Sequence, residues 1–484
     1  MSIKYLYDRK KIAITYGEQK YSYADVIKYV NYYSEFLDIS KGDRVALMME
    51  NRPESIFSFF SIWAKKGIAL SLDAGYTVEQ LAYVLSDSTP KYIFISNKVK
   101  EVVEKANEKI GNIVKILVVD EISLPDNYIP KQEEYHNDSD EEVAIIVYTS
   151  GTTGNPKGVM ITYENIRANM DGITAANLVN DTDSILAMLP YHHIMPLCFT
   201  LILPMYLGVP VILLTEISSA SLLKTLQENV VTVILGVPRV WEMLDKAIMT
   251  KINESSLARF MFKMASKINS MSIRKMLFSK VHKQFGGHIR LMVSGGAKID
   301  KNILEDFRTM GFCAIQGYGM TETAPIIAFN VPGRERSDSV GEVIPNVEVK
   351  IADDGEILVK GKNVMKGYYN NEKATEEAFD KDGWFHTGDL GRMDGKYLII
   401  IGRKKEMIVL PNGKNIDPND IENEIIKNTD LIKEIAVTEY KEQLLAIIYP
   451  DFQQIEAKKI VNIKDAIKWE VIDKYNVTAP NYKK

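Results

Sequence analysis

Apolar runs and amphipathic stretches alternate along the first part of the chain. Residues 23–37 carry apolar side chains at helical spacing, and 44–49 form a short apolar run after a Lys-Gly-Asp turn. The order repeats with an amphipathic stretch over 55–65 and an apolar run over 68–72. Helices and strands in alternation are typical of a largely parallel sheet that is covered by helices. The pattern therefore predicts an α/β fold.

Glycine closes several of the apolar runs farther along the chain. Runs at 143–147 and 159–161 predict two buried strands, and Thr162 is placed to cap the helix that follows the second one. Two later runs lead into Gly236 and into Gly295-Gly296. Ligands of parallel sheets bind beyond the carboxyl ends of the strands. We therefore expect these glycines to line the same cleft as the loop between the first two runs.

The pattern of apolar runs changes in the last third of the sequence. Short, glycine-punctuated apolar runs are typical of a small β-rich unit, and a mixed pattern, with a helix expected over 418–427, follows to the end. A chain of 484 residues is too long for one hydrophobic core. We expect a large N-terminal domain of helix-covered parallel sheets over 1–403, including a small β-barrel subdomain over 334–401, and a small α+β C-terminal domain over 404–484.

Composition places the chain among ordinary globular proteins. Hydrophobic residues make up 46% and charged residues 25%, and the net charge is −5. This balance gives no indication of nucleic-acid binding, so an anionic ligand must be held by local donors. The only cysteines, Cys198 and Cys313, exclude a disulfide framework and a cysteine-rich metal site. The sequence opens with no basic-then-apolar leader, and these features together predict a cytoplasmic protein.

Two segments raise the question of a membrane. Residues 184–215 contain no Asp, Glu, Lys or Arg, but prolines interrupt them and the flanking charges are acidic. We interpret them as buried strands and a helix of the core. Residues 251–290 have a basic, helical pattern interleaved with Met and Phe. They suit either contact with an acidic membrane surface or a solvated amphipathic helix pair, and the sequence favours the helix pair.

A hydroxyl-rich loop connects the runs at 143–147 and 159–161. It carries glycines that let the backbone approach a bulky anion, four Ser/Thr hydroxyls and the positive charge of Lys157. A polyphosphate is the ligand that this composition suits. The loop is not a Walker A motif, because Pro156 precedes Lys157 and a strand is expected to follow. An ordinary polar hairpin is the alternative for this loop taken alone.

Two later turns carry further polar groups. Residues 316–322 present a tyrosine that can stack on a nucleobase, Thr321 that can contact a phosphate, and Glu322 that can hold Mg²⁺. Residues 383–389 end at Asp389, whose carboxylate suits a ribose diol, and Arg403 suits the same sugar or a phosphate. The alternatives are that the carboxylates belong to turn or cap residues and that the arginine is a surface charge.

The order of these motifs gives the separate indications a common explanation. Motifs that resemble those of the adenylate-forming superfamily, which includes acyl-CoA synthetases, luciferases and peptide-synthetase adenylation domains, occur in family order at 148–159, 318–322, 386–389 and 402–413. The resemblance covers nearly the whole chain. Within the superfamily, residues 237–242 and 403–408 look most like the long-chain fatty-acid–CoA ligase branch.

The resemblance implies a two-step reaction. A carboxylate attacks the α-phosphate of ATP, which gives acyl-AMP and pyrophosphate, and a phosphopantetheine thiol then takes the acyl group. The uncharged segment 184–215 and the branch resemblance favour a medium- or long-chain fatty acid. The superfamily resemblance implies ATP with Mg²⁺ and CoA as the acceptor. A ligase that loads an acyl carrier protein is the nearest alternative. Amino-acid adenylation is disfavoured because the region around His193 offers no aspartate to pair with an amino group.

The resemblance also assigns a role to individual residues. The expected catalytic residues are Lys157, His193, Thr321 and Glu322, with Lys405 as the hinge of the C-terminal domain. Glu322, with Thr149, is expected to hold Mg²⁺, and Gly413 to lie against the pantetheine arm. The histidine could instead be a hydrogen-bonded core residue, and Lys405 a surface lysine. The nucleotide-binding residues are expected to be Thr149, Ser150, Gly151, Thr152, Thr153, Gly154, Lys157, Gly295, Gly296, Ala297, Gln316, Gly317, Tyr318, Gly319, Met320, Thr321, Asp389 and Arg403.

The sequence departs from the family pattern at its end. The family has a Pro-x-x-x-x-Gly-Lys segment whose lysine assists adenylation, whereas residues 479–484 resemble only the lead-in to that segment. Lys483 and Lys484 are not obvious substitutes. Either the chain is cut short or its C-terminal domain is reduced, and slow adenylation is the expected consequence. A non-catalytic nucleotide-binding protein is the alternative from a different class.

Overall fold

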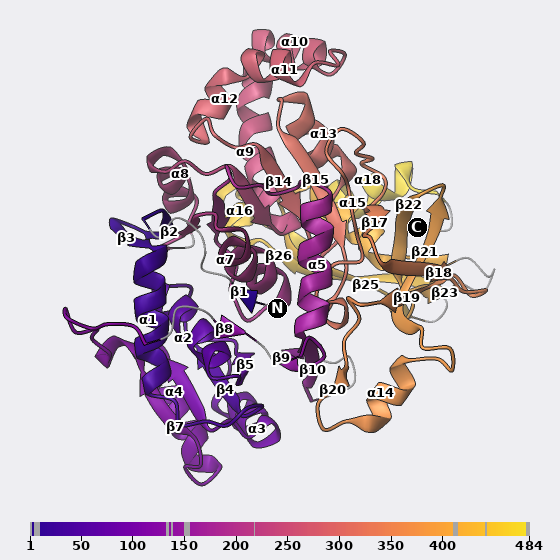
Figure 1. Cartoon of the computed structure of the whole chain (residues 1–484). Helices are drawn as coiled ribbons and strands as arrows, with labels where there is room; N and C mark the ends of the chain where they lie inside the picture. Colours follow the sequence, from indigo (N-terminus) through magenta and orange to yellow (C-terminus); the bar gives the residue numbers. More distant parts are fainter. Residues whose placement is uncertain are drawn as a thin grey trace. The chain divides into compact units, whose positions relative to one another are not determined.

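The computed structural model forms two compact units, each described here by itself (Figure 1). The first unit comprises Met1–Val349, Val359–Phe385 and Gly395–Leu398, and the second comprises Lys350–Leu358, His386–Asp394 and Ile399–Lys484. The second unit thus includes two stretches of the β-rich segment as well as the C-terminal residues. The structure describes residues 2–3, 10–131, 135–136, 139–149, 155–216, 218–409, 415–440 and 443–480.

The first sheet of the first unit is parallel at its centre and antiparallel at one edge. Its order is β20-β10-β9-β5-β4-β6-β7, and the pairs from β9 to β7 are parallel, whereas β9, β10 and β20 pair antiparallel. The strands are β4 (Arg44–Met48), β5 (Ile68–Ser71), β6 (Tyr92–Ile95), β7 (Lys115–Val118), β9 (Val143–Thr149), β10 (Lys157–Thr162) and β20 (Gly367–Tyr368).

Helices cover both faces of this sheet, as the alternation of the sequence predicts. Val45 and Leu47 belong to the same buried cluster as α1 (Tyr23–Glu35) and α2 (Pro53–Ala64). The intervening Ala46 and Met48 lie in a second cluster with residues of α3 (Val78–Ser88) and α4 (Lys100–Lys109). Successive side chains of a strand point to opposite faces, so a continuous apolar run is needed to fill both cores.

The second sheet of the first unit is also parallel at its centre. Its order within this unit is β17-β16-β15-β14-β13-β11-β12-β2-β3, and the pairs from β15 to β2 are parallel. The strands are β2 (Ile12–Tyr16), β3 (Gln19–Ser22), β11 (Ile185–Ala187), β12 (Val211–Leu213), β13 (Val233–Gly236), β14 (Leu291–Ser294), β15 (Cys313–Tyr318), β16 (Ala328–Phe329) and β17 (Gly341–Val343).

Helices α8 (Ser219–Glu228), α9 (Pro238–Glu254) and α13 (Lys301–Thr309) share a buried cluster with these strands. Helix α5 (Tyr163–Ala175) begins at Thr162, whose hydroxyl accepts a hydrogen bond from the Asn165 N–H, as predicted. Strand β15 runs to Tyr318, farther than the apolar run suggests, because its end pairs with β16.

The uncharged segment 184–215 belongs to the core. It folds as β11, α6 (Ile194–Pro196), a π-helical turn (Leu197–Ile202), α7 (Leu203–Leu207) and β12. Leu197, Phe199 and Ile202 are all buried. Its lack of charge is therefore required for packing and does not by itself indicate an acyl-binding surface. Among the described residues, no helix combines the length and the hydropathy needed to cross a bilayer.

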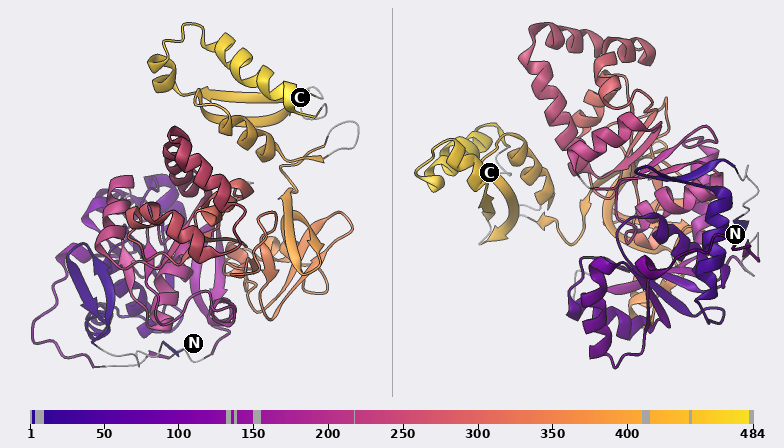
Figure 2. Two further views of the ribbon diagram at one scale, coloured as in Figure 1. Left: turned by 90° about the horizontal axis from the view of Figure 1, so that it is seen from above. Right: turned by 90° about the vertical axis from the view of Figure 1, so that its left-hand side faces the viewer.

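The basic segment is helical, as predicted, but three short helices follow α9 where the sequence suggested a pair. They are α10 (Ser256–Ala265), α11 (Met271–Leu277) and α12 (Ser279–Gln284). In Figure 1 and the right-hand view of Figure 2, α10 and α11 lie at the end of the first unit, beyond the edge of its sheets.

The second unit combines strands of the β-rich segment with a small α+β unit. The β-rich strands follow the order β18-β19-β21-β22. A separate buried cluster packs α15 (Pro418–Lys427), at the predicted position, against the antiparallel pair β25 (Ile432–Tyr440) and β26 (Gln443–Pro450). The other elements are β18 (Val347–Ile351), β19 (Glu356–Gly361), β21 (Phe385–Asp394), β22 (Tyr397–Arg403), β23 (Ile408–Val409), β24 (Asn415–Ile416), α16 (Phe452–Ala457), α17 (Ile463–Ile467) and α18 (Asp473–Thr478).

Candidate active site

The predicted phosphate loop joins two antiparallel strands. Thr149 ends β9 and is paired directly with Lys157, the first residue of β10. The pairing places Lys157 at the end of the two strands that adjoins the loop, opposite Thr149, which carries a hydroxyl. Because a strand follows the loop, as predicted, the site is not a Walker A motif. The expected ligands Ser150, Gly151, Thr152, Thr153 and Gly154 lie outside the described residues.

Tyr368 lies between two of the predicted site residues. Strand β20 pairs with β10, and the Nζ atom of Lys157 lies 5.0 Å from the centroid of the Tyr368 ring. The hydroxyl of Tyr368 donates a 2.9 Å hydrogen bond to Oε1 of Glu322. Burial raises the pKa of Tyr368, and the charge of Glu322 raises it further. The phenol is therefore a neutral donor at neutral pH, and it connects the loop lysine with the acidic residue.

Local contacts hold Glu322 in place. It belongs to a 3-10 turn (Thr321–Thr323), and its carbonyl accepts a 2.8 Å hydrogen bond from the Met365 N–H. Glu322 is partly exposed. Carboxylate oxygens and hydroxyls are the hard oxygen donors that Mg²⁺ prefers. No cluster of three or more His, Cys, Asp or Glu side chains suited to a metal occurs among the described residues.

The carboxyl ends of three parallel strands bring the predicted glycines together. Gly236 of β13 is in register with Ser294 of β14, which is in register with Gln316 of β15. The Gly295 N–H donates to the Gly236 carbonyl at 3.2 Å. These strand ends therefore share one edge, and Gly296 and Ala297 are exposed immediately beyond it. That these glycines line the same cleft as the loop after Thr149 stays a prediction, because residues 150–154 lie outside the described part of the chain.

Gln316 and Gly319 of the 316–322 motif stabilise the local structure. The side-chain amide of Gln316 donates to the carbonyls of Ser337 and Ser339 at 3.2 and 2.9 Å. This side chain thus holds a neighbouring loop, and the adjacent backbone of Gly317 and Tyr318 remains partly exposed. Gly319 must be glycine, because a Cβ atom there would overlap the carbonyl of Pro325.

The segment with the expected histidine packs against the second sheet. A Cβ atom on Gly295 would lie 2.6 Å from Sδ of Met195, so this glycine permits the close approach. The rings of His192 and His193 lie 4.1 Å apart, and Nε2 of His192 is 3.7 Å from Oδ2 of Asp73. Burial, together with the neighbouring His193, lowers the pKa of His192 to about 4. Burial also lowers the pKa of His193, so both imidazoles are neutral at neutral pH.

Asn51 fixes this histidine segment, and no local pattern points to this residue. Its Nδ2 donates to the Leu189 carbonyl at 2.7 Å, and its Oδ1 accepts from the Tyr191 N–H at 3.1 Å. The two bonds clamp the backbone immediately before His192. A single asparagine after an apolar run has no distinctive spacing, which is why sequence analysis missed it.

The second unit holds the residues expected to bind ribose. Asp389 lies inside β21 with 6% of its side chain exposed, and one of its oxygens accepts a 3.0 Å ion-paired hydrogen bond from Nε of Arg403, which is 51% exposed. Asp389 is thus a strand residue, whereas the sequence suggested a turn. Lys405 is an exposed turn residue, and Gly413 lies outside the described residues.

Glu356 organises the strand that carries Asp389. Its buried carboxylate accepts hydrogen bonds from the Gly388 N–H at 2.9 Å, from the Lys404 ammonium at 2.9 Å and from the ring of His386 at 3.1 Å. Burial alone would raise the pKa of Glu356, but these donors outweigh burial and lower it. A charged carboxylate therefore fixes the backbone on both sides of the predicted ribose site.

Comparison with known proteins decides the family. The model of the AMP-binding enzyme family matches residues 7–369, and that of the AMP-binding enzyme C-terminal domain matches residues 405–484. The chain belongs to the AMP-binding enzyme family. The resemblance to adenylate-forming acyl-CoA synthetases is thereby confirmed, as is the expected fold class.

Relatives of this AMP-binding enzyme include ligases of long-chain fatty acids. The long-chain-fatty-acid–CoA ligase FadD15 of Mycobacterium bovis is 29% identical over 465 residues, which cover 89% of this chain and 76% of the relative. Long-chain-fatty-acid–CoA ligase 1 of Cavia porcellus is 28% identical, with 85% of this chain and 66% of the relative covered. The chain thus spans about two thirds to three quarters of the length of these relatives.

Solved structures similar to this AMP-binding enzyme include synthetases with other acids. O-succinylbenzoate coenzyme A synthetase (MenE) from Bacillus subtilis in complex with AMP has a TM-score of 0.76 and 26% identity, and 98% of this chain and 90% of that chain are covered. Apo MatB from Rhodopseudomonas palustris has a TM-score of 0.73 and 25% identity, with 93% and 89% covered. The comparisons show the family, but they do not show which carboxylic acid this chain activates.

Proposed function

We propose that this AMP-binding enzyme is an ATP-dependent acyl-CoA ligase that activates a medium- or long-chain fatty acid. The curated relatives support the substrate class. The observation that carries the proposal is the arrangement of Lys157 and Glu322 on either side of Tyr368. The ammonium of Lys157 suits the phosphates of ATP, and the carboxylate of Glu322 suits the metal ion that accompanies them. Both groups contact Tyr368.

The first half-reaction must bring two anions together. Lys157 is proposed to neutralise charge on the β- and γ-phosphates while the acid attacks the α-phosphate, with pyrophosphate as the leaving group. Donors aimed at developing negative charge are a large source of catalysis in such transfers. Glu322 and Thr149 would hold Mg²⁺, which would supply further positive charge to the triphosphate. Thr321 is proposed to contact the phosphate from the same turn.

The remaining residues are proposed to position the substrates. A neutral His193 can donate a hydrogen bond to the acyl carboxylate without pairing so strongly that it weakens the nucleophile. The exposed backbone at Gly296 and Ala297, just beyond the strand ends, is proposed to border adenine, and Asp389 with Arg403 is proposed to bind the ribose. A CoA thiol would then displace AMP from the acyl carbonyl, forming the thioester.

Pyrophosphate exchange tests the proposal. The full chain is assayed with fatty acids of increasing length, o-succinylbenzoate, other aryl acids and amino acids, with CoA or acyl carrier protein added in separate reactions. We expect exchange with fatty acids and product formation with CoA. Lys157→Ala should lower the exchange rate about 100-fold or more. Lys366→Ala, which alters an exposed lysine beside β20, is the matched control and should leave it unchanged.

Other outcomes would replace the proposal. Exchange with another acid alone would reassign the substrate, and thioester formation only on carrier protein would reassign the acceptor. Binding of ATP without exchange for any acid would show a non-catalytic nucleotide-binding protein. A chain extended at its C-terminus by a Gly-Lys segment of the family pattern, assayed in parallel, separates a slow enzyme from an inactive one.

A further inference from the structure

Helices α10 and α11 are anchored to the first unit by their inner faces. On α10, Ala265 is buried and the ring of Phe262 packs against Phe278 with centroids 6.0 Å apart. On α11, the guanidinium of Arg274 donates to the carbonyls of Ile268 at 2.6 Å and Arg308 at 3.1 Å. The orientation of both helices is therefore defined, and what they present outward is a property of the fold.

The outward face of α10 is apolar. Leu257, Phe260 and Met264 are 66%, 61% and 50% exposed, and their spacing places them on one side of the helix at about 100° per residue. The face that packs inward comprises Ala258, Phe262 and Ala265, which lie on a neighbouring stripe. The helix thus has two apolar stripes, and only one of them is used by the core.

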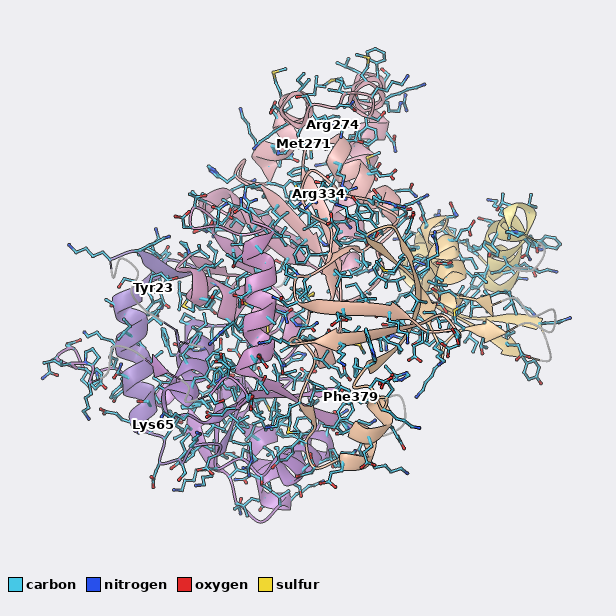
Figure 3. All side chains as sticks on the ribbon, turned by 45° about the vertical axis from the view of Figure 1, so that its right-hand side comes forward. Tyr23, Lys65, Met271, Arg274, Arg334 and Phe379 are labelled. Atoms are coloured by element: carbon cyan, nitrogen blue, oxygen red, sulfur yellow. The ribbon has the colours of Figure 1, made fainter. Side chains whose placement is uncertain are left out.

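Helix α11 extends the exposed apolar surface. Ile273 and Met276 are 44% and 68% exposed, one turn apart, and Met271 at the start of the helix is also exposed. No residue of α11 is fully buried. Figure 3 labels Met271 and Arg274 on this helix and shows side chains of this region extending outward from the ribbon. Large apolar side chains gathered on one exposed surface usually mark a binding surface.

The charged side chains of the segment that carries these helices are all basic. The segment 255–285 contains seven Lys or Arg residues and no Asp or Glu, in a chain whose net charge is −5. On α10, Arg259, Lys263 and the following Lys267 form a stripe of exposed residues next to the exposed apolar stripe. The basic residues of the segment are Arg259, Lys263, Lys267, Arg274, Lys275, Lys280 and Lys283.

We propose that the outer faces of α10 and α11 dock this protein on an anionic lipid membrane. The exposed Leu, Phe, Ile and Met side chains enter the interface between headgroups and acyl chains, and the flanking lysines and arginines pair with lipid phosphates. An apolar stripe beside a basic stripe is the pattern of helices that lie in the plane of a membrane surface. The helices are short and polar on one side, so they lie on the bilayer.

The arrangement fits a membrane better than the alternatives. A solvated amphipathic pair, which the sequence favours, would turn its large apolar side chains inward, whereas Phe260 and Leu257 are turned outward. A second copy of the chain would bring two strongly basic surfaces together, and like charges at close range oppose association. An anionic bilayer satisfies both the apolar and the basic side chains at once.

Vesicle flotation of the full chain tests the proposal. We expect binding to vesicles of phosphatidylcholine mixed with phosphatidylglycerol, weak binding to phosphatidylcholine alone, and loss of binding as salt rises. Leu257→Gln/Phe260→Gln/Met264→Gln should weaken binding to the mixed vesicles at least about tenfold, and Lys263→Glu/Lys267→Glu should do the same. Tryptophan placed at Phe260 should show a blue-shifted emission on binding.

Matched variants elsewhere on the first unit serve as controls. Ile113→Gln/Ile129→Gln removes exposed apolar side chains outside the patch, and Lys373→Glu/Lys381→Glu makes the same charge change outside it. Both should bind vesicles as the parent does. Circular dichroism and pyrophosphate exchange without vesicles should be unchanged in the patch variants, so the result is independent of the proposed function.

Three results would overturn the proposal. The first is a parent chain that does not bind anionic vesicles. The second is patch variants that bind them as tightly as the parent. The third is sedimentation velocity showing that the patch forms a dimer of this chain, with the patch variants monomeric and vesicle binding unaffected.

Discussion

The hydroxyl of Tyr368 donates to Oε1 of Glu322 at 2.9 Å, across 46 residues of sequence. The same ring lies beside the ammonium of Lys157. Lys157 and Glu322, the proposed phosphate and metal ligands, thereby contact the same side chain. Such preorganisation lowers the cost of ordering charged groups in the transition state.

Removing this hydroxyl should slow adenylation. Tyr368→Phe keeps the ring beside Lys157 and removes the donor to Glu322. A hydrogen bond to a charged group contributes about 1.5–3 kcal/mol, so we expect the pyrophosphate-exchange rate to fall about tenfold or more, with a higher Mg²⁺ requirement. Tyr369→Phe, one residue along, is the control. Equal exchange rates and equal Mg²⁺ dependence for the two variants would show that the bond has no positioning role.

Loss of the clamp on the histidine segment should affect binding of the acid. Asn51→Ala removes both bonds to the backbone around Leu189 and Tyr191. We expect a several-fold higher KM for the acid with little change in KM for ATP, and a loss of about 1–3 kcal/mol in the free energy of unfolding. Asn253→Ala, which changes an exposed asparagine of α9 in the same unit, is the control. A parallel rise in both KM values would argue against a role specific to the acid.

The lowered pKa of His192 should appear in the pH dependence of stability. The pKa is about 4 in the folded protein and about 6.5 in an unfolded chain. The unfolded state therefore takes up a proton first as pH falls. The stabilising contribution is fully present above about pH 6.5 and is lost as the pH falls toward 4, with a slope of up to about 1.4 kcal/mol per pH unit.

Thermal unfolding of parent and His192→Gln over this pH range measures the effect. The variant should lose less stability than the parent between pH 6.5 and 4. His288→Gln, which changes an exposed histidine, should follow the parent curve. NMR titration of His192 gives an independent check, and a midpoint near 6.5 would contradict the expected burial effect.

The proposed hinge at Lys405 predicts a split between the half-reactions. Lys404 is anchored by hydrogen bonds to Asp354 and Glu356, and its N–H donates to the Gly388 carbonyl, whereas the exposed Lys405 follows directly. Lys405→Pro restricts the backbone at this point. We expect thioester formation to fall at least about tenfold and pyrophosphate exchange to change less.

Lys405→Ala is the control, because it removes the charge and keeps the backbone freedom. It should retain both rates. If Lys405→Pro left both half-reactions unchanged, a different residue would have to act as the hinge. If Lys405→Ala reproduced the loss seen with proline, the lysine side chain would be responsible and the backbone would not.

Much of the fold follows from local patterns. The continuous apolar runs predicted β4, β5, β9, β13 and β14, and they are buried because each strand fills cores on both of its faces. The loop between 149 and 157 was correctly placed between two strands. Local patterns did not predict which motif residues belong to strands. Strand β15 continues to Tyr318 through its pairing with β16, and Asp389 lies within β21.

The sequence by itself determined the kinds of element, the order of the motifs and the chemistry of their side chains, because hydrophobic period and residue type are local properties. Only the tertiary structure brought Tyr368 beside Glu322 and Lys157, and Asn51 to a segment 138 residues away. It also decided which apolar stripe of α10 is buried. These choices depend on strand pairing and packing between distant segments, and no local pattern specifies which segments those are.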